Sequence, residues 1–291
     1  MNKILITGAS GFIGRALVSK LKVQGRDVVS VDSADGDIAN QQTLAKFAPQ
    51  DIAHVFHLAG KTFVPDSWDD PQSFCHTNVQ GTINVLEYCR KSRTPLTYVS
   101  AYVYGHPDAL PIREDSAIRP SNPYALTKRL AEQACEFYAA EHDLQVATIR
   151  PFNVYGIGQG ANFLIPSIIN QVLDSGAKIV VKDLQPKRDY VYLEDLLKAL
   201  LATLNTNSKG YNVYNIGSGV SLSVKEVIDV VQDVAGTHKK IICENLVRTN
   251  ELMDVVADIS KAGNDLGWHP EYSFRAGIEN IIRSEQEKRQ V

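Results

Sequence analysis

Cysteine is scarce in this 291-residue sequence. Four cysteines form no C-x-x-C pair, and no histidine cluster accompanies them at zinc-ligand spacing: Cys75, Cys89, Cys135 and Cys243. We therefore expect reduced thiols in a reducing compartment and no bound metal.

Long apolar runs are also missing. The run at the N-terminus ends at Thr7-Gly8, well short of the roughly 7–15 apolar residues of a signal peptide. No stretch approaches the roughly 18 apolar residues that a membrane span needs. We expect a cytoplasmic protein without a membrane partner.

The third absence is a basic excess, because the formal net charge is −3. Proteins that grip a polyanion backbone usually carry surplus cations, so we expect no nucleic-acid partner. A small anionic ligand needs only one or two well-placed cations, and the charge balance leaves it open.

The first half of the chain alternates two patterns. Five short apolar runs are typical of strands covered on both faces: Lys3–Thr7, Asp27–Val31, His54–His57, Thr97–Ser100 and Gln145–Arg150. Three longer amphipathic stretches lie between them: Phe12–Val23, Pro71–Lys91 and Pro123–His142. This alternation predicts an α/β fold with a doubly wound, Rossmann-like parallel sheet.

The alternation becomes irregular after Arg150. Four helical patterns and three short strands follow: Ile165–Leu173, Leu193–Asn205, Val224–Ala235 and Ala276–Lys288, then Lys178–Val181, Asn212–Ile216 and Lys240–Cys243. We predict a first domain over residues 1–155, a possible return of the chain to its sheet near 211–217, and a smaller C-terminal lobe over residues 156–291.

A glycine-rich segment joins the first strand to the first helix. Gly8 permits a sharp turn, Gly11 permits close approach of a pyrophosphate, and Gly14 lets the helix lie against the strand. The helix N-terminus, with the N–H groups of Phe12 and Ile13, favours a phosphate. Although the glycines are spaced three apart throughout, the strand–loop–helix context predicts a dinucleotide site.

Acidic residues near the end of the second strand bear on which dinucleotide binds. Asp32 follows that strand, where a carboxylate accepts hydrogen bonds from ribose hydroxyls and repels a 2′-phosphate, so we expect NAD rather than NADP. Asp37-Ile38 suits an adenine ring and its amino group, but Asp37 is equally suited to cap a helix over Ala39–Phe47.

Tyr124 and Lys128 stand four residues apart on one predicted helix and therefore share a face. A nearby ammonium favours the phenolate and lowers the pKa of a tyrosine, which makes the pair a candidate general base. Alone, the pair equally fits an ordinary helix face. Ser100 ends a predicted parallel strand, where ligands of such sheets bind, and it can contact the same substrate oxygen.

These features together give the chain a family resemblance. The motifs that carry it are Thr7–Gly14 (TGASGFIG), Asp32, His57–Gly60 (HLAG), Asn78–Thr82 (NVQGT), Ser100 with Val103–Gly105, Tyr124 with Lys128, Arg150–Gly156 (RPFNVYG), Arg188–Val191 (RDYV) and Ala257–Ala262 (ADISKA). In this order they resemble the extended short-chain dehydrogenase/reductases, the NAD-dependent epimerase/dehydratase family, which act on nucleotide-diphosphate sugars.

The resemblance implies roles for individual residues. Tyr124 would be the base, Lys128 would hold the nicotinamide ribose and Ser100 would orient a sugar hydroxyl. The remaining implied contacts are Leu58, Ala59, Gly60 and Asn78 along NAD, and Asn153, Arg188 and Arg248 on the substrate diphosphate. Lys61 suits either the sugar or solvent, and His57 suits a structural strand end. The C-terminal lobe would bind the substrate.

The resemblance leaves three functions open. Sugar-nucleotide dehydratases carry Asp-Glu after the catalytic hydroxyl residue, whereas Ala101-Tyr102 stands here and cannot expel water, which disfavours dehydration. We favour a 4-epimerase similar to UDP-glucose 4-epimerase. A 4-keto-6-deoxysugar reductase is the alternative, favoured by the short chain and by Phe163 where some epimerases have Asn; a non-catalytic NAD sensor is the third. By analogy, helices over Pro71–Lys91 and Pro123–His142 would pair in a homodimer.

Overall fold

A six-stranded parallel sheet forms the centre of the computed structural model, which describes residues 3–47, 51–206, 209–246 and 251–289. Its strands run in the order β2-β1-β3-β4-β5-β9. Their bounds are β1 Lys3–Thr7, β2 Val28–Val31, β3 Ile52–His57, β4 Leu96–Val99, β5 Val146–Pro151 and β9 Tyr211–Ile216. All five strands predicted in the first half are present, and residues 211–216 do return to this sheet as its edge strand.

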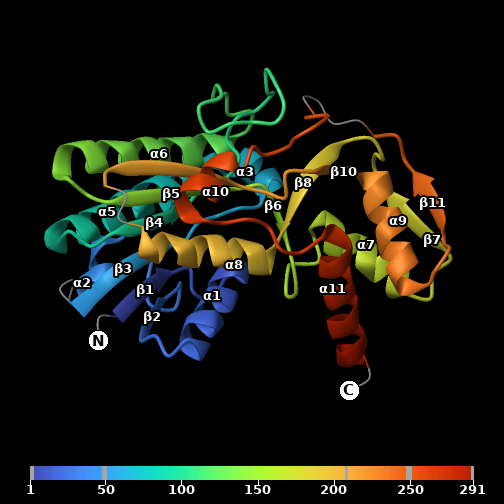
Figure 1. The fold of residues 1–291 in the computed structure, drawn as a ribbon, viewed down its shortest axis with the longest axis horizontal. Coiled ribbons are helices and arrows are strands. Elements are labelled where there is room, and N and C mark those ends of the chain that lie inside the picture. Colours follow the sequence, from blue (N-terminus) through green and yellow to red (C-terminus); the bar gives the residue numbers. More distant parts are fainter. Residues whose placement is uncertain (1–2, 48–50, 207–208, 247–250, 290–291) are drawn as a thin grey trace.

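Helices cover both faces of the sheet, as the predicted doubly wound fold requires (Figure 1). Helices α1 (Phe12–Val23) and α8 (Leu193–Ala202) pack on one face, where Leu17 and Leu197 are fully buried. On the other face lie α5 (Gly81–Ser92) and α6 (Pro123–His142). Strands buried on both faces explain why their sequences are almost continuously apolar.

The helix predicted over Pro71–Lys91 differs in one respect from the expectation. It consists of α4 (Pro71–Phe74), a π-helical segment (Cys75–Gln80) and α5 in direct succession. The wider turn inserts one extra residue into the helical repeat, which apolar periodicity does not reveal. As a result the side chain of Asn78 turns inward and is buried.

Two short helices and an irregular loop complete this part of the chain. The helices are α2 (Gln41–Ala45), which lies within the helix offered as one alternative over Ala39–Phe47, and α3 (Val64–Asp69), which the sequence patterns did not indicate. Between β4 and α6, residues 100–122 form no helix or long strand and touch residues 251–259 through an isolated bridge between Ile112 and Ala257.

The C-terminal lobe contains two small sheets and three helices around their own apolar cluster. The three-stranded sheet is β10 (Ser221–Ser223), β8 (Lys187–Tyr192) and β6 (Asn153–Tyr155), and the two-stranded sheet pairs β11 (Lys240–Cys243) with β7 (Lys178–Val181). The helices are α7 (Leu164–Leu173), α9 (Val224–Ala235) and α11 (Phe274–Arg289). Helix α9 begins with a capping box between Ser223 and Glu226, a local signal that matches its predicted start.

The two parts of the chain interleave. Helix α8 and helix α10 (Ser260–Leu266) lie in the cluster on the main sheet, although both follow residue 156. A division at residue 155 therefore stays a prediction.

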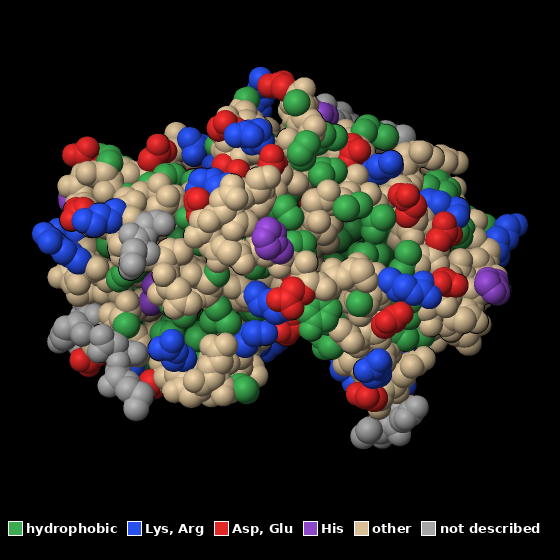
Figure 2. All heavy atoms as spheres, in the orientation of Figure 1, with side chains coloured by type: hydrophobic (Ala, Val, Ile, Leu, Met, Phe, Trp, Pro, Cys, Tyr) green, Lys and Arg blue, Asp and Glu red, His purple; other side chains and the backbone are tan. Residues whose placement is uncertain are grey.

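Figure 2 shows acidic and basic side chains interspersed over the visible face. Within the described parts of the chain, every helix is too short or too polar to span a bilayer.

Candidate active site

The glycine-rich loop is built around close backbone contacts. Gly8 has φ +72°, and a Cβ there would lie 2.6 Å from the backbone nitrogen of Ala59. A Cβ on Gly14 would lie 2.1 Å from the carbonyl oxygen of Gly8. No side chain caps α1 at Gly11, so the N–H groups of its first turn face outward without an acceptor in the helix. This cradle fits a pyrophosphate.

Two carboxylates stand at the carboxyl end of β2. The Asp32 carboxylate accepts a hydrogen bond from the N–H of Ala34 at 2.9 Å, and the Asp35 carboxylate accepts one from the N–H of Asp32 at 3.0 Å. The hydrogen bond from Asp32 and the ammonium of Lys46 hold the pKa of Asp35 below its usual value. The neighbouring charges disfavour a phosphate on the ribose.

Asp37 and Ile38 lie further along the same edge. Asp37 accepts from the N–H of Ala39 at 2.9 Å and lies 2.8 Å from Nε2 of His76. The short helix that follows begins only at Gln41 and is capped by Asn40, so Asp37 is not its N-cap. The Asp37 carboxylate is exposed beside buried Ile38, an arrangement that suits an adenine.

His57 ends β3 as a structural residue. Its ring hydrogen-bonds Thr7 at 2.7 Å and Thr82 at 3.0 Å, which joins two strands to α5. Burial lowers the pKa of His57 to about 3, so the ring stays neutral. The next residues, Leu58–Gly60, form the turn along which Ala59 meets the glycine loop.

Asn78 holds the loop that follows this turn. Its amide accepts from the N–H of Lys61 at 2.8 Å, and donates to the carbonyl of Lys61 at 3.1 Å and to Thr127 at 2.9 Å. The side chain of Asn78 is thus occupied in positioning the loop. The Lys61 ammonium is exposed and donates to Ser73 at 2.7 Å.

Ser100, Lys128 and Gly60 converge at the carboxyl edge of the sheet. The Lys128 ammonium donates to the carbonyl of Val99 at 2.9 Å, and a Cβ on Gly60 would lie 3.4 Å from it. Burial lowers the pKa of Lys128 to about 8. The Ser100 hydroxyl is buried with no hydrogen-bond partner among the described residues. Because buried hydroxyls normally find a partner, Ser100 is suited to a ligand oxygen.

Tyr124 lies one turn before Lys128 on α6, whose N-terminus is capped by Asn122. In the chain alone, burial and the nearby Tyr102 phenol raise the pKa of Tyr124. Lys128 does not lower the pKa of Tyr124 in the chain alone, and its ammonium donates to the carbonyl of Val99. Deprotonation of Tyr124 therefore needs further positive charge at the site.

The residues predicted to bind the substrate diphosphate include Asn153 on β6 and Arg188 on β8. Asn153 donates to the carbonyl of Asp189 at 3.0 Å. Arg188 is ion-paired with Glu251 and donates to the carbonyl of Leu252, so a substrate phosphate would have to share or replace these partners. Arg248 lies outside the described residues.

Comparison with known sequences agrees with this geometry. Residues 4–217 match the model of the NAD dependent epimerase/dehydratase family. The chain belongs to this family. A putative UDP-glucose 4-epimerase of Methanocaldococcus jannaschii is 32% identical, over 96% of this chain and 97% of that protein. GDP-6-deoxy-D-mannose reductase of Pseudomonas aeruginosa is 30% identical, over 96% of each chain.

Solved structures of similar proteins share the whole fold. RMD from Pseudomonas aeruginosa, complexed with NADPH, has a TM-score of 0.90 and 30% identity, covering 99% of this chain and 100% of that one. MoeE5 in complex with UDP-glucose and NAD has a TM-score of 0.89 and 30% identity, covering 99% of each chain. The relatives of this epimerase/dehydratase family member thus include both epimerases and reductases.

Three structural features of this family member were not predicted from sequence. Glu132 and Arg150 form a buried ion pair with bonds of 2.9 and 2.7 Å that anchors α6 to β5. Asp189, fully buried, accepts four hydrogen bonds from the N–H groups and hydroxyl of Ser218, Gly219 and Ala257. The third is the position of Tyr102 against Phe152 and Asn153. All three features depend on contacts between segments distant in the sequence, which the periodicity of apolar residues cannot show.

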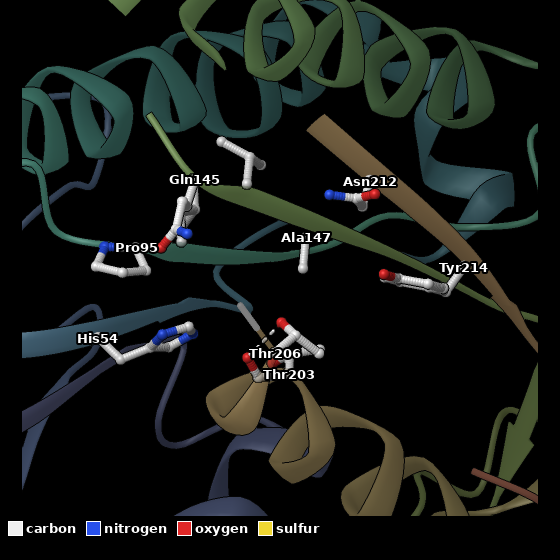
Figure 3. Close-up of a pocket in the computed structure, with 10 residues that line it drawn as sticks. His54, Pro95, Gln145, Ala147, Thr203, Thr206, Asn212 and Tyr214 are labelled. Carbon is white, nitrogen blue, oxygen red and sulfur yellow. Dashed lines mark hydrogen bonds between the residues drawn. The ribbon is translucent and has the colours of Figure 1, made fainter. Parts of the chain in front are cut away.

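A small cavity of about 20 Å³ opens away from this site (Figure 3). It is lined by residues at the amino ends of β4, β5 and β9, among them Pro95, Gln145 and Asn212. Ligands of open α/β sheets bind at the opposite, carboxyl edge. The cavity has room for about one water and lies outside the candidate active site.

Among the described residues, no group of three or more His, Cys, Asp or Glu is placed to hold a metal ion.

Proposed function

We propose that this protein is an NAD-dependent epimerase that inverts C4 of a sugar carried on a nucleotide diphosphate. One observation carries the proposal: the Lys128 ammonium lies beside Gly60 and donates to the carbonyl of Val99, the residue before Ser100, whose buried hydroxyl has no partner among the described residues. Tyr124 lies one turn before Lys128 on the same helix. A base, a cation and an oriented hydroxyl at one edge of the sheet are what oxidation of an alcohol requires.

The residues of the chain would divide the proton and binding steps among them. The Ser100 hydroxyl bonds the C4 oxygen of the sugar, and Tyr124 takes the C4 hydroxyl proton as the carbon becomes a ketone. NAD, when bound along Gly8–Gly14 and Gly60, supplies the hydride acceptor and a positive charge that favours the Tyr124 phenolate. The Lys128 ammonium would then add its own positive charge in support of the Tyr124 phenolate. Tyr124 returns the proton when the opposite face of the ketone is reduced.

The cofactor is assigned as NAD rather than NADP from the end of β2. The carboxylates of Asp32 and Asp35 suit ribose hydroxyls and would repel a 2′-phosphate. An epimerase needs one retained cofactor and no net reductant, so NAD held throughout the cycle suits this reaction.

A 4-keto-6-deoxysugar reductase is the second candidate. Phe163 stands before α7 where the amide of some epimerases would bind, and it contacts Phe63 with ring centroids 6.3 Å apart. The similarity to GDP-6-deoxy-D-mannose reductase also supports a reductase function. The reductase would use Ser100, Tyr124 and Lys128 in the reducing direction only.

The proposal extends to assembly and location. Leu126, Leu130 and Phe137 form an exposed apolar stripe along α6, with Phe137 57% exposed. Such a stripe supports a homodimer in which α5 and α6 face a second copy. The four free cysteines, two of them buried, are compatible with a reducing compartment such as the cytoplasm.

The test is a panel of UDP-, dTDP-, GDP- and CDP-sugars, analysed by mass spectrometry and NMR for new sugar nucleotides. We expect epimerisation without added cofactor, and a loss of about 10²–10⁴-fold in turnover for Tyr124→Phe with NAD binding retained. Turnover that requires NADPH and a 4-keto sugar would establish the reductase instead. Binding of NAD without any turnover would establish the sensor.

A further inference from the structure

Tyr102 lies at the junction between the proposed catalytic residues and the C-terminal lobe. It follows Ser100 by two residues in the loop after β4 and is half-buried. Its ring stacks on Phe152, with centroids 5.4 Å apart and an interplanar angle of 24°. This stacking fixes the direction of the ring and brings the hydroxyl to 3.5 Å from the side-chain oxygen of Asn153.

The surroundings of this hydroxyl are rich in neutral polar groups. The Tyr102 phenol is close enough to affect two other tyrosines, and it contributes to the raised pKa of both Tyr124 and Tyr190. Asn153 and Tyr190 are register partners on β6 and β8, so their side chains emerge on the same face of the small sheet. Tyr102 therefore lies near Tyr124 on α6 as well as near Asn153 and Tyr190 on the small sheet.

One of these groups lacks a partner. The Tyr190 hydroxyl is buried, with the residue only 6% exposed, and no described residue hydrogen-bonds it. The same holds for Ser100, two residues before Tyr102 in the same loop. Leaving a buried hydroxyl unpaired is costly, so these two hydroxyls, on the segments that adjoin Tyr102, suit a polar ligand.

We propose that Tyr102 is a specificity-determining residue whose phenol hydrogen-bonds a hydroxyl substituent flanking C4 of the sugar. The inference rests on the proposed function, because Ser100 and Tyr124 place C4. Tyr124, Asn153 and Tyr190 are among its neighbours and offer neutral donors and acceptors, while the nearby Arg188 is ion-paired with Glu251. These neighbours suit a hydroxyl-bearing sugar.

The experiment combines removal of the phenol hydroxyl with removal of the sugar hydroxyl. Affinity for UDP-glucose and its 3-deoxy and 6-deoxy analogues is measured by calorimetry with NAD present, for the parent protein and Tyr102→Phe. We expect Tyr102→Phe to weaken binding of UDP-glucose about tenfold, the usual effect of losing one hydrogen bond in a buried site. One of the two deoxy analogues lacks the sugar hydroxyl that the Tyr102 phenol would bond. That analogue should bind to the parent protein and to Tyr102→Phe with equal affinity.

The control is Tyr138→Phe, which removes a phenol bonded to Glu87 at 2.6 Å on α6, away from the carboxyl edge of the sheet. It should bind all three ligands as the parent does. In kinetics, Tyr102→Phe should raise KM with kcat within about twofold, whereas Tyr124→Phe lowers kcat. Equal binding of UDP-glucose by parent and Tyr102→Phe would overturn the inference, as would a tenfold loss that persists with both analogues. Full turnover by Tyr124→Phe would instead overturn the proposed function.

Discussion

At the scale of single residues, the site contains side chains with two different tasks. Asn78 and His57 spend their hydrogen-bonding capacity on neighbouring parts of the chain, and so they shape the cofactor cleft. Ser100 and Tyr190 have buried hydroxyls without a partner among the described residues. Because each unpaired hydroxyl costs about 1–3 kcal/mol, we infer that a ligand completes them.

Asp32 gives a prediction about cofactor choice. Asp32→Ser removes a carboxylate that repels a 2′-phosphate and accepts from ribose hydroxyls, so NAD should bind more weakly and NADP more tightly. We expect the preference for NAD over NADP to fall at least about tenfold, measured by calorimetry. The matched control is Asp27→Ser, an acid just before β2 at the opposite end of that strand. An unchanged preference in Asp32→Ser would remove the reason for assigning NAD.

At the scale of elements, local sequence signals predicted some parts fully. Helix α6 begins at Pro123 with Asn122 as its cap and ends at His142, as predicted, because capping and periodicity are local. The glycine-rich loop between the first strand and the first helix was predicted equally well. The candidate triad was predicted from spacing, since four residues on a helix share a face and strand ends share an edge.

Other elements could not be read in this way. The loop over residues 100–122 is held by distant partners: Glu114 accepts from the N–H of Asn215 at 2.8 Å, and Ile112 pairs with Ala257. The π-helical segment around Asn78 resembles ordinary helix in its apolar pattern. The raised pKa of Tyr124 depends on its burial and on the nearby Tyr102 phenol, neither of which the spacing of Tyr124 and Lys128 reveals.

A chain of hydrogen bonds joins three elements and predicts acid sensitivity. His54 on β3 bonds Thr97 on β4 at 2.8 Å, and Thr97 bonds Thr203 after α8 at 2.6 Å; His54 and Thr203 are visible in Figure 3. Burial lowers the pKa of His54 to about 3. The unfolded chain, with an ordinary pKa of about 6.5, binds more protons between these values, so the free energy of unfolding falls as pH falls from about 6.5 toward 3.

The measurement is urea unfolding from pH 7 to pH 4. His54→Gln removes one titrating group and should reduce the pH dependence of the free energy of unfolding by up to about 1.4 kcal/mol per pH unit. His106→Gln changes an exposed ring and serves as the control. A pH dependence that is the same in His54→Gln and the parent would show that His54 does not titrate as the structure indicates.

At the scale of the whole molecule, the site is assembled from both parts of the chain. Tyr124 and Ser100 come from the main sheet and its helices, whereas Asn153 and Tyr190 come from the small sheet. Strand β9 and Asp189 link the two parts, because Asp189 accepts from Ser218 just after β9. Substrate and cofactor would therefore meet where these parts join.

The exposed stripe on α6 gives a prediction about assembly. Phe137→Glu places a charge in the proposed dimer face and should convert dimer to monomer in sedimentation velocity at micromolar concentration. The control is Val23→Glu, an exposed apolar residue at the end of α1 that lies outside the stripe. A parent protein that sediments as a monomer would refute the dimer.

The proposed inversion at C4 requires oxidation and re-reduction of the same carbon, in which Ser100 and Tyr124 would hold the sugar oxygen and move its proton and bound NAD would supply the hydride chemistry. The most direct test uses a nucleotide sugar deuterated at C4, chosen from those converted in the panel, with the purified protein and no added cofactor. We expect an epimer that keeps its deuterium, with no net change in NADH absorbance. Loss of the deuterium to solvent, or product formation only with stoichiometric consumption of NADH or NADPH, would contradict it.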